Sequence, residues 1–466
     1  MDRNIKIKDN LSRNAAIYTV GNLFNKAILV LSSPVFTRLL STNEYGQVTV
    51  YITWLGIFTV FTGLELGGSL TNAYYDYGEK NYRAYAKTCI SLSMLATLVI
   101  ILAVVLFQER MEKVFNLDYS LVLLAFLHSF FNNNIMYLSQ YLSLLRKAVP
   151  YVLISIGQSA LNILFSLAAI IYSDWNPALS RIYGQFFASA LFGILITVFF
   201  LCNKEKILNF KYLKYGLLLS VPLMFHMLGG LILSGSDKLM LSRIADDSVT
   251  GLYGFAVSVV TIINAVSISF NTAWMPYLYE MLKKRQIKIL QKRTEQYLSC
   301  FTFLSCGFML VMPEMVKVLA DKAYWDCIPL VIPLVIGEYF RFLYFFPANY
   351  EFYHKQNQWI ATSTMLTGII NIGLNLLWIP FLGMYGAALS TVISYVLCFV
   401  FHEAVARGRI GNFYVKVKIY VINTFILCMT AITSWIFLQC GAVRWIAACV
   451  YAGILLRRIL RDKKLF

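Results

Sequence analysis

The sequence is a succession of apolar runs, each about 20 residues long and separated by short polar connections. A run of that length can cross the hydrocarbon core of a bilayer as a helix. Of the 466 residues, 59% are hydrophobic and 14% are charged, against about 25% charged in soluble domains. Lipid accepts only helices and closed barrels, and barrel strands alternate apolar with polar residues. The continuous runs therefore predict an all-α polytopic membrane protein.

We expect about 14 transmembrane helices, since that many runs reach the required length. Their approximate ranges are 15–40, 48–70, 86–107, 120–142, 151–172, 182–201, 213–236, 252–274, 298–318, 328–347, 360–380, 383–401, 415–437 and 443–456. Residues 1–13 are polar and basic, and no small-residue cleavage site follows them. We therefore expect the first span to be retained rather than removed as a signal peptide.

The basic residues are distributed unequally between the two sets of connections. Of the 40 Lys and Arg residues, 29 fall on the side of the N-terminus and nine on the opposite side. Because Lys and Arg are enriched in cytoplasmic loops, this asymmetry predicts that both termini are cytoplasmic. The net charge of +17 then reflects membrane topology and attraction to anionic lipid, and we expect no nucleic-acid partner.

Short motifs recur at similar separations in the two halves of the chain. The recurring pairs are Tyr45-Gly46 with Tyr253-Gly254, Leu161-Asn162 with Leu374-Asn375, and Tyr183-Gly184 with Tyr385-Gly386. Such recurrence favours a duplicated unit, an arrangement in which transporters place the substrate path between the halves. We expect an N-terminal six-helix lobe at 1–203, a cytoplasmic linker at 204–212, a C-terminal six-helix lobe at 213–406, and two appended helices with a basic tail at 407–466.

Two cations lie deep inside predicted spans, where ionisable residues are costly and usually functional. Lys26 is about 16 Å into the first span, near the bilayer midplane, beside Asn25. Arg341 is similarly deep in the tenth span and follows Glu338 at i, i+3. These cations could line a water-filled cavity that binds a phosphate or pyrophosphate. Alternatively, Lys26 extends to the interface or pairs with a neighbouring carboxylate, and Arg341 pairs only with Glu338.

The remaining intramembrane polar residues are candidates for coupling or gating. Glu65, in a Gly-rich segment of the second span, is the best candidate for a carboxylate that couples transport to Na⁺ or H⁺. Asp237 and Lys238, near the outer end of the seventh span, more readily fix helix geometry than bind substrate. For His128 and His226 we favour hydrogen-bonded interior residues over functional ones.

Signatures of catalysis and metal binding are missing from the sequence. It contains no Gly-rich phosphate loop with its Lys, no G-x-S-x-G and no H-E-x-x-H. The nine cysteines lack a C-x-x-C pair and are expected to be buried and inert. We therefore expect neither an enzyme nor a cofactor or metal site.

Several segments resemble the bacterial polysaccharide exporters of the multidrug/oligosaccharidyl-lipid/polysaccharide (MOP) flippase superfamily. The matching segments are Arg-Leu-Leu-Ser-Thr-Asn-Glu-Tyr-Gly at 38–46, Ser-Asp-Lys-Leu-Met-Leu at 236–241, Gly-Leu-Tyr-Gly at 251–254, Ala-Trp-Met-Pro-Tyr-Leu-Tyr at 273–279 and Gly-Met-Tyr-Gly-Ala-Ala-Leu at 383–389. The resemblance covers the first twelve spans. Lipid II flippases are similar in architecture, but this chain has Asn25-Lys26 near the place where they tend to carry an Arg-Asp pair.

The resemblance implies two lobes that alternate access to the two sides of the bacterial plasma membrane. It implies an undecaprenyl-pyrophosphate-linked oligosaccharide as substrate, moved from the inner to the outer leaflet, with a glycan polymerase and glycosyltransferases of the same pathway as partners. The alternative within the superfamily is a cation-coupled multidrug exporter, which should carry a buried acid in the first span or deep in the N-terminal lobe. A membrane-embedded polymerase or ligase would need a sizeable outer loop, and the outer connections are short.

Overall fold

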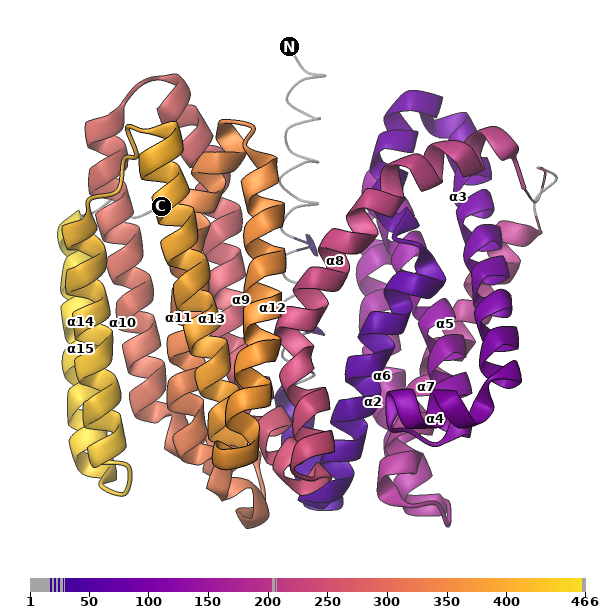
Figure 1. Cartoon of the computed structure of the whole chain (residues 1–466), viewed down its shortest axis with the longest axis horizontal. Coiled ribbons are helices and arrows are strands. Elements are labelled where there is room, and N and C mark those ends of the chain that lie inside the picture. The colour runs from indigo at the N-terminus through magenta and orange to yellow at the C-terminus, as the bar shows by residue number, and fades with distance from the viewer. Residues whose placement is uncertain are drawn as a thin grey trace. The chain divides into compact units, whose positions relative to one another are not determined.

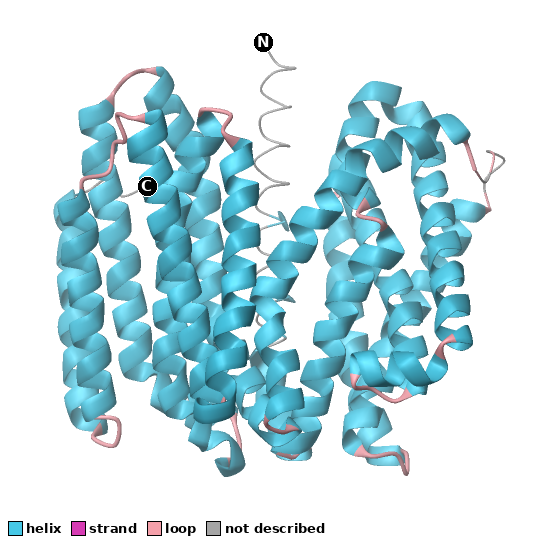
Figure 2. Cartoon of the chain, in the orientation of Figure 1, coloured by secondary structure: helices cyan, strands magenta, loops and turns pink. Residues whose placement is uncertain are grey.

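The described part of the chain folds entirely into helices joined by short loops (Figures 1 and 2). The computed structural model describes residues 17–18, 21, 24–25, 28, 30–202, 206 and 208–462. Its helices are α2 (Thr42–Gly63), α3 (Leu66–Leu106), α4 (Gln108–Phe115), α5 (Tyr119–Leu144), α6 (Ala148–Tyr172), α7 (Pro177–Leu201), α8 (Phe210–Ile244), α9 (Asp247–Lys283), α10 (Ile287–Leu319), η1 (Lys322–Cys327), α11 (Ile328–Tyr353), α12 (Asn357–Leu382), α13 (Met384–Ala404), η2 (Val405–Ile410), α14 (Val417–Ile436) and α15 (Gly441–Asp462). The predicted all-α fold is confirmed.

The helices have the length and composition of membrane spans. Within the described residues, 11 helices are long and apolar enough to cross a bilayer, and α2 with the first part of α3 forms a bent twelfth. The first expected span, 15–40, is described only in part, and α15 occupies the position of the last. The structure is therefore consistent with about fourteen spans, as hydropathy predicted. The chain is a multi-span membrane protein.

The described chain divides into two compact units. Unit 1 comprises residues up to Leu40 together with 47–231, and unit 2 comprises Ser41–Gly46 together with 232–466. The division falls inside α2 and inside α8, so each of these helices contributes to both units. The lobe boundaries inferred from sequence, with a linker at 204–212, remain a prediction.

Each unit has its own apolar interior. In unit 1 the interior is formed by several clusters, and a central one joins α3, α5 and the end of α7 through residues such as Leu70, Tyr85 and Tyr137. In unit 2 one continuous core runs through α9, α10, α11 and α14. Its members include Phe301 and Phe342, whose rings stack with centroids 3.9 Å apart. These cores fix the helices from which the polar residues project.

A reciprocal contact between two helix starts in unit 2 has the regular spacing that an internal repeat would produce. A Cβ on Gly46 would lie 1.8 Å from the carbonyl oxygen of Asp247, and a Cβ on Gly251 would lie 1.9 Å from that of Thr42. Residues 42 and 247, like residues 46 and 251, are 205 positions apart. The two helix starts therefore exchange equivalent contacts. Sequence alone paired Gly46 with Gly254, which is three residues further along the same helix.

The two helix starts are also capped at equivalent positions. At α2, the Ser41 backbone N–H donates to Glu44 Oε2 at 2.7 Å and the Glu44 N–H donates to Ser41 Oγ at 3.3 Å, a capping box. At α9, the Val249 N–H donates to Asp246 Oδ1 at 2.8 Å. Since residue 246 lies 205 positions after residue 41, the capping positions repeat with the glycines.

The last two helices, α14 and α15, lie beside α10 of unit 2 (Figure 1), and a buried arginine of α15 joins them to it. Arg444 of α15 is 1% exposed and makes a two-pronged ion pair with Glu314 of α10. The same guanidinium donates to the carbonyl oxygens of Leu310 at 2.8 Å and Phe437 at 3.1 Å. These bonds use both the charge and the planar donor set of arginine.

Candidate functional site

Arg341 and Glu338 form an ion pair on α11 in unit 2. Arg341 Nη1 lies 3.2 Å from Glu338 Oε1, and the two side chains are 28% and 15% exposed. The other oxygen of Glu338 accepts a hydrogen bond of 3.0 Å from Asn264 Nδ2 on α9. The pairing that the i, i+3 spacing allows is therefore present.

The surroundings of Arg341 leave part of its guanidinium available. Tyr344, one turn further along α11, and Tyr395 of α13 lie close enough to interact with it electrostatically. A guanidinium has five N–H donors, and Glu338 accepts only some of them. Binding of an anion such as phosphate is thus chemically feasible here, in competition with Glu338. A role of Arg341 in substrate binding stays a prediction.

The structure describes only some residues of the first expected span. Lys26 lies outside the described residues. Asn25 donates from Nδ2 to Ser155 Oγ of α6 at 2.7 Å, and its Oδ1 is buried without a hydrogen-bond partner in the described structure. The side-chain oxygen of Asn25 can therefore accept a further hydrogen bond. A role of Asn25 in substrate binding stays a prediction.

Glu65 occupies a break between α2 and α3 in unit 1. Leu64 and Glu65 have φ of 48° and 50°, the left-handed region that non-glycine residues rarely adopt. The two helices meet there at 41°. Two consecutive residues in this region are strained by about 1–2 kcal/mol each. The Glu65 carboxyl group is half-buried at the break.

Side chains of α3 and α5 donate hydrogen bonds to carbonyl groups at the break and in the helical turn before it. The bonds are Tyr137 Oη–H to Gly63 O at 2.8 Å, Ser93 Oγ–H to Thr62 O at 2.8 Å, and Asn133 Nδ2–H to Thr59 O at 3.0 Å. Broken helices persist within a membrane only when such groups find partners. The polar residues of α5, which the sequence places in an otherwise apolar span, therefore support the break that presents Glu65.

His128 is a hydrogen-bonded interior residue, as predicted. Its Nδ1 lies 3.1 Å from Tyr51 Oη and its Nε2 lies 3.0 Å from Ser189 Oγ. The residue is 2% exposed. Both ring nitrogens are occupied, so the imidazole joins α2, α5 and α7. The side chain of His226 is not among those described.

Asp237 is buried near the predicted outer end of α8 in unit 2, 4% exposed. Its Oδ2 accepts a short hydrogen bond from the Tyr253 hydroxyl on α9, and its Oδ1 accepts from the Lys238 backbone N–H at 2.8 Å. The carboxylate thus joins α8 to α9, which agrees with the structural role that the sequence favoured. The preceding residue, Ser236, donates to Asn371 Oδ1 on α12 at 3.0 Å.

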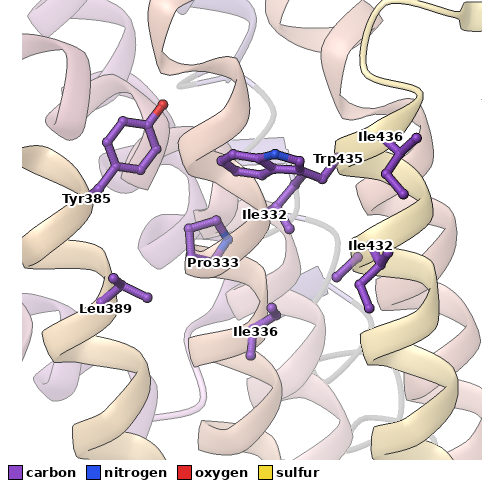
Figure 3. A pocket seen from close by; sticks show the side chains of 9 residues that line it. Ile332, Pro333, Ile336, Tyr385, Leu389, Ile432, Trp435 and Ile436 are labelled. Carbon is purple, nitrogen blue, oxygen red and sulfur yellow. The ribbon is translucent and has the colours of Figure 1, made fainter.

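An apolar groove opens between α11, α13 and α14 in unit 2 (Figure 3). Its volume is about 380 Å³. In Figure 3, Tyr385 of α13 lies on one side of the groove and Trp435 of α14 on the other, with Pro333 of α11 between them. The lining is formed by Ile332, Pro333, Ile336, Tyr385, Leu389, Ala431, Ile432, Trp435 and Ile436. Such a lining suits a hydrocarbon chain and offers almost no polar partner.

The sequence analysis missed one buried pair of titratable residues. Glu351 of α11 and His402 of α13 are 0% and 1% exposed and lie 2.9 Å apart, Oε1 to Nδ1. The expected spans ended at residues 347 and 401, which left both residues in loops. In the structure α11 continues to Tyr353 and α13 to Ala404. A sequence signal for this pair was present, because the acid and the histidine each lie just beyond the end of an apolar run.

No cluster of metal-binding side chains was found in the part of the chain that the structure describes: no three His, Cys, Asp or Glu residues are grouped suitably there. The nine cysteines are unpaired, and Cys202, Cys428, Cys440 and Cys449 are exposed rather than buried. Their exposure corrects the expectation of a uniformly buried set, because three of the four lie on the appended hairpin, which has few covering neighbours.

Comparison with known proteins gives relatives of matching length. Two proteins of Haemophilus influenzae are similar in sequence. An "Uncharacterized membrane protein" is 22% identical over 397 residues, covering 81% of this chain and 94% of the relative. The "Lsg locus putative protein 1" is 23% identical over 415 residues, covering 83% and 97%.

The fold is shared with solved transporters. The lipid II flippase MurJ in an inward closed conformation matches with a TM-score of 0.76 at 14% identity, covering 96% of this chain and 99% of that one. An inward-facing multidrug resistance MATE family transporter of the MOP superfamily matches with a TM-score of 0.65 at 14% identity, covering 83% and 94%. At this identity the likeness concerns the fold. The family model described as "Polysaccharide biosynthesis protein" matches residues 11–282, more than half of the chain, and the protein belongs to that family.

Proposed function

We propose that the protein moves a polyprenyl-pyrophosphate-linked oligosaccharide from the cytoplasmic to the outer leaflet of the bacterial plasma membrane. The observation that carries the proposal is the polysaccharide-biosynthesis family match on a chain built of membrane-spanning helices. A pathway that makes surface polysaccharide must carry its lipid-linked intermediate across the membrane, and a protein built of many membrane-spanning helices suits that task. Transport would proceed by alternating access, with both termini cytoplasmic.

Arg341 is the described residue best placed to hold the pyrophosphate. It is a partly exposed cation within a membrane-spanning helix, and arginine can bind phosphate with two parallel hydrogen bonds. Glu338 would hold the guanidinium in place between transport events and release it to the anion. The sequence also assigns Lys26 and Asn25 to substrate binding, and each would contribute to binding the pyrophosphate or the sugar.

The apolar groove of unit 2 would hold part of the polyprenyl chain. Its lining is almost wholly hydrocarbon, so an isoprenoid could occupy it without desolvating polar groups. Tyr385 and Trp435, which line the groove, are of residue types that favour the membrane interface. The lipid would then stay in contact with the protein while the sugar and pyrophosphate cross.

Movement against a gradient needs an energy source, for which we propose an inward flow of Na⁺ or H⁺. Glu65, at the strained break of unit 1, and Asp237, buried in unit 2, are the carboxylates that sequence assigned to coupling or gating, together with Glu338 and Lys238. Glycosyltransferases would supply the substrate on the cytoplasmic side, and a polymerase would consume it outside.

The proposal can be tested by measuring flipping of a polyprenyl-pyrophosphate oligosaccharide in vesicles containing purified protein. Arg341→Ala should lower the rate about tenfold to hundredfold, the equivalent of a lost charged hydrogen bond. Lys288→Ala, which removes an exposed cation of the same unit, is the matched control and should stay within about twofold. A wild-type rate no higher than that of protein-free vesicles would contradict the proposed transport. Full activity of Arg341→Ala would contradict only the role of this residue.

A further inference from the structure

The buried pair Glu351–His402 is a candidate site that none of the functions above uses. The two residues come from α11 and α13, which pack closely in the core of unit 2. Both side chains are almost completely excluded from solvent, and Nδ1 of His402 lies 2.9 Å from Oε1 of Glu351. Ionisable pairs inside a membrane protein mark proton and ion pathways by default.

Few other charges act on this pair. His402 also interacts with Cys398, one turn earlier on α13, whose Sγ lies 3.5 Å from Ser363 Oγ of α12. The Tyr344 ring of α11 stacks on the imidazole, with centroids 5.6 Å apart and an interplanar angle of 18°. Glu403, the residue after His402 on α13, pairs instead with Arg407 of η2.

The pair is balanced only when it carries one proton. The second oxygen of the carboxyl group, Glu351 Oε2, is buried without a hydrogen-bond partner within the described chain. A proton shared between imidazole and carboxylate leaves no net charge, which a low-dielectric interior tolerates. Without it, an uncompensated carboxylate would remain buried beside a neutral imidazole. Such a state is stabilised only if water reaches the carboxylate.

The position of the pair makes that water entry a local movement. Glu351 is two residues before the end of α11, and His402 is two residues before the end of α13. Only the connection 354–356 and η2 follow, at the end of the unit that basic residues place on the cytoplasmic side. A small separation of the ends of α11 and α13 would hydrate the pair.

The pair is also connected to the predicted anion site. Tyr344 lies beside both His402 and Arg341. Residues 341, 344 and 351 follow one face of α11, and Arg341 and Glu351 are about 15 Å apart along the helix. A change in the charge of the pair can therefore act on Arg341 through one aromatic ring.

We propose that Glu351 and His402 form a proton-binding site, and that loss of this proton opens the end of unit 2 formed by α11 and α13. The ligand is a proton rather than a metal ion, since the described residues group no third His, Cys, Asp or Glu with suitable geometry. The idea that this proton is the coupling ion for transport rests on the proposed function. Proton binding by the pair, and the opening that follows loss of the proton, do not rest on it and can be measured without substrate.

Cys398 is a natural reporter of this opening, because it is buried next to His402. Its labelling by N-ethylmaleimide should be followed in a variant of the full chain that keeps only Cys398. A variant that keeps only the exposed Cys202 corrects for the intrinsic pH dependence of the thiol reaction. Between about pH 6 and about pH 9, where an imidazole site can titrate, the ratio of the two rates should rise about tenfold.

Glu351→Gln removes the carboxylate, so no uncompensated charge appears and the ratio should stay flat within about twofold. The double variant Glu351→Gln with His402→Gln keeps a neutral hydrogen bond and should also be flat, which guards against a folding defect of the single variant. Glu403→Gln, next to His402, is the matched control and should keep the rise. A flat ratio in the otherwise wild-type protein, or a rise that persists in Glu351→Gln, would overturn the proposal. Neither outcome depends on whether the protein flips lipid-linked sugar.

Discussion

The close contact between the starts of α2 and α9, called the α2–α9 crossing below, leads to a specific prediction for Gly46. Replacing Gly46 with Ala would place a methyl carbon 1.8 Å from the Asp247 carbonyl oxygen. Ordinary van der Waals contact begins at 3.4 Å, so the two helix starts would have to separate by about 1.6 Å. The methyl carbon is attached directly to the backbone of α2, and the oxygen that it meets belongs to the backbone of α9. Neither atom can move aside as the end of a flexible side chain can.

The magnitude follows from what such a separation disturbs. Overpacking of a close contact costs about 1–3 kcal/mol, and the upper end applies because no side chain can relax. The separation would also weaken the Thr42 Oγ1 to Ser248 Oγ hydrogen bond of 2.6 Å and the contact of Tyr45 with Phe255. We expect Gly46→Ala to lower the melting temperature of the purified protein by several degrees.

The assay is thermal unfolding in detergent, followed by the loss of monodisperse protein. Gly307→Ala is the matched control, since this helical glycine of unit 2 has open space around its missing Cβ. It should stabilise the protein by up to about 1 kcal/mol through reduced backbone entropy. Equal melting temperatures for Gly46→Ala and Gly307→Ala would refute the close crossing.

Three further predictions concern other contacts. Glu314→Gln leaves the buried Arg444 guanidinium without its carboxylate, and we expect a loss of about 3 kcal/mol, seen as faster proteolysis ahead of the appended hairpin. Tyr137→Phe removes the donor to the Gly63 carbonyl group at the helix break and should cost about 1–3 kcal/mol in thermal unfolding, whereas an unchanged melting point would show that water or another group takes its place. Arg341→Lys keeps the charge but loses the planar donor set, so flipping in vesicles should fall about tenfold, and an unaltered rate would argue against two-pronged phosphate binding.

Much of the fold could be predicted from hydropathy because the membrane constrains it strongly. Apolar runs of bilayer length become helices whatever their neighbours do, since the backbone has no other way to satisfy its hydrogen bonds in lipid. The ion pair of Arg341 with Glu338 was also accessible, because i, i+3 neighbours on a helix meet without any tertiary information.

Other features depend on tertiary structure and could not be predicted from the sequence. The contact of Glu351 with His402 joins residues 51 positions apart, and hydropathy ended both helices too early. The recurring Tyr-Gly pairs are 208 residues apart, whereas the equivalent contacts of α2 and α9 are 205 residues apart. A recurring Tyr-Gly pair marks similar sequence, whereas the glycine that the crossing needs is Gly251, which no dipeptide match identified.

The break at Leu64 and Glu65 illustrates a further limit. The sequence places Glu65 in a Gly-rich segment of the second span, but Gly67 and Gly68 are helical and two non-glycine residues adopt the left-handed conformation. Hydrogen bonds from α3 and α5 to the carbonyl groups of Thr62 and Gly63 accompany this conformation, and a single-span pattern does not contain them. Sequence therefore located the polar residue of interest and missed the strain that presents it.

The most direct test of the central claim is lipid analysis of a strain that lacks this protein. Polyprenyl-linked oligosaccharide and surface polysaccharide should be measured together, with the leaflet of the sugar-lipid determined by its accessibility to an impermeant reagent. Transport of a lipid-linked oligosaccharide predicts that the sugar-lipid accumulates on the inner leaflet while the surface polymer is lost. Normal surface polysaccharide with altered drug sensitivity would contradict the claim and identify a drug exporter, and completed units on the outer leaflet that are not polymerised would contradict transport by this protein.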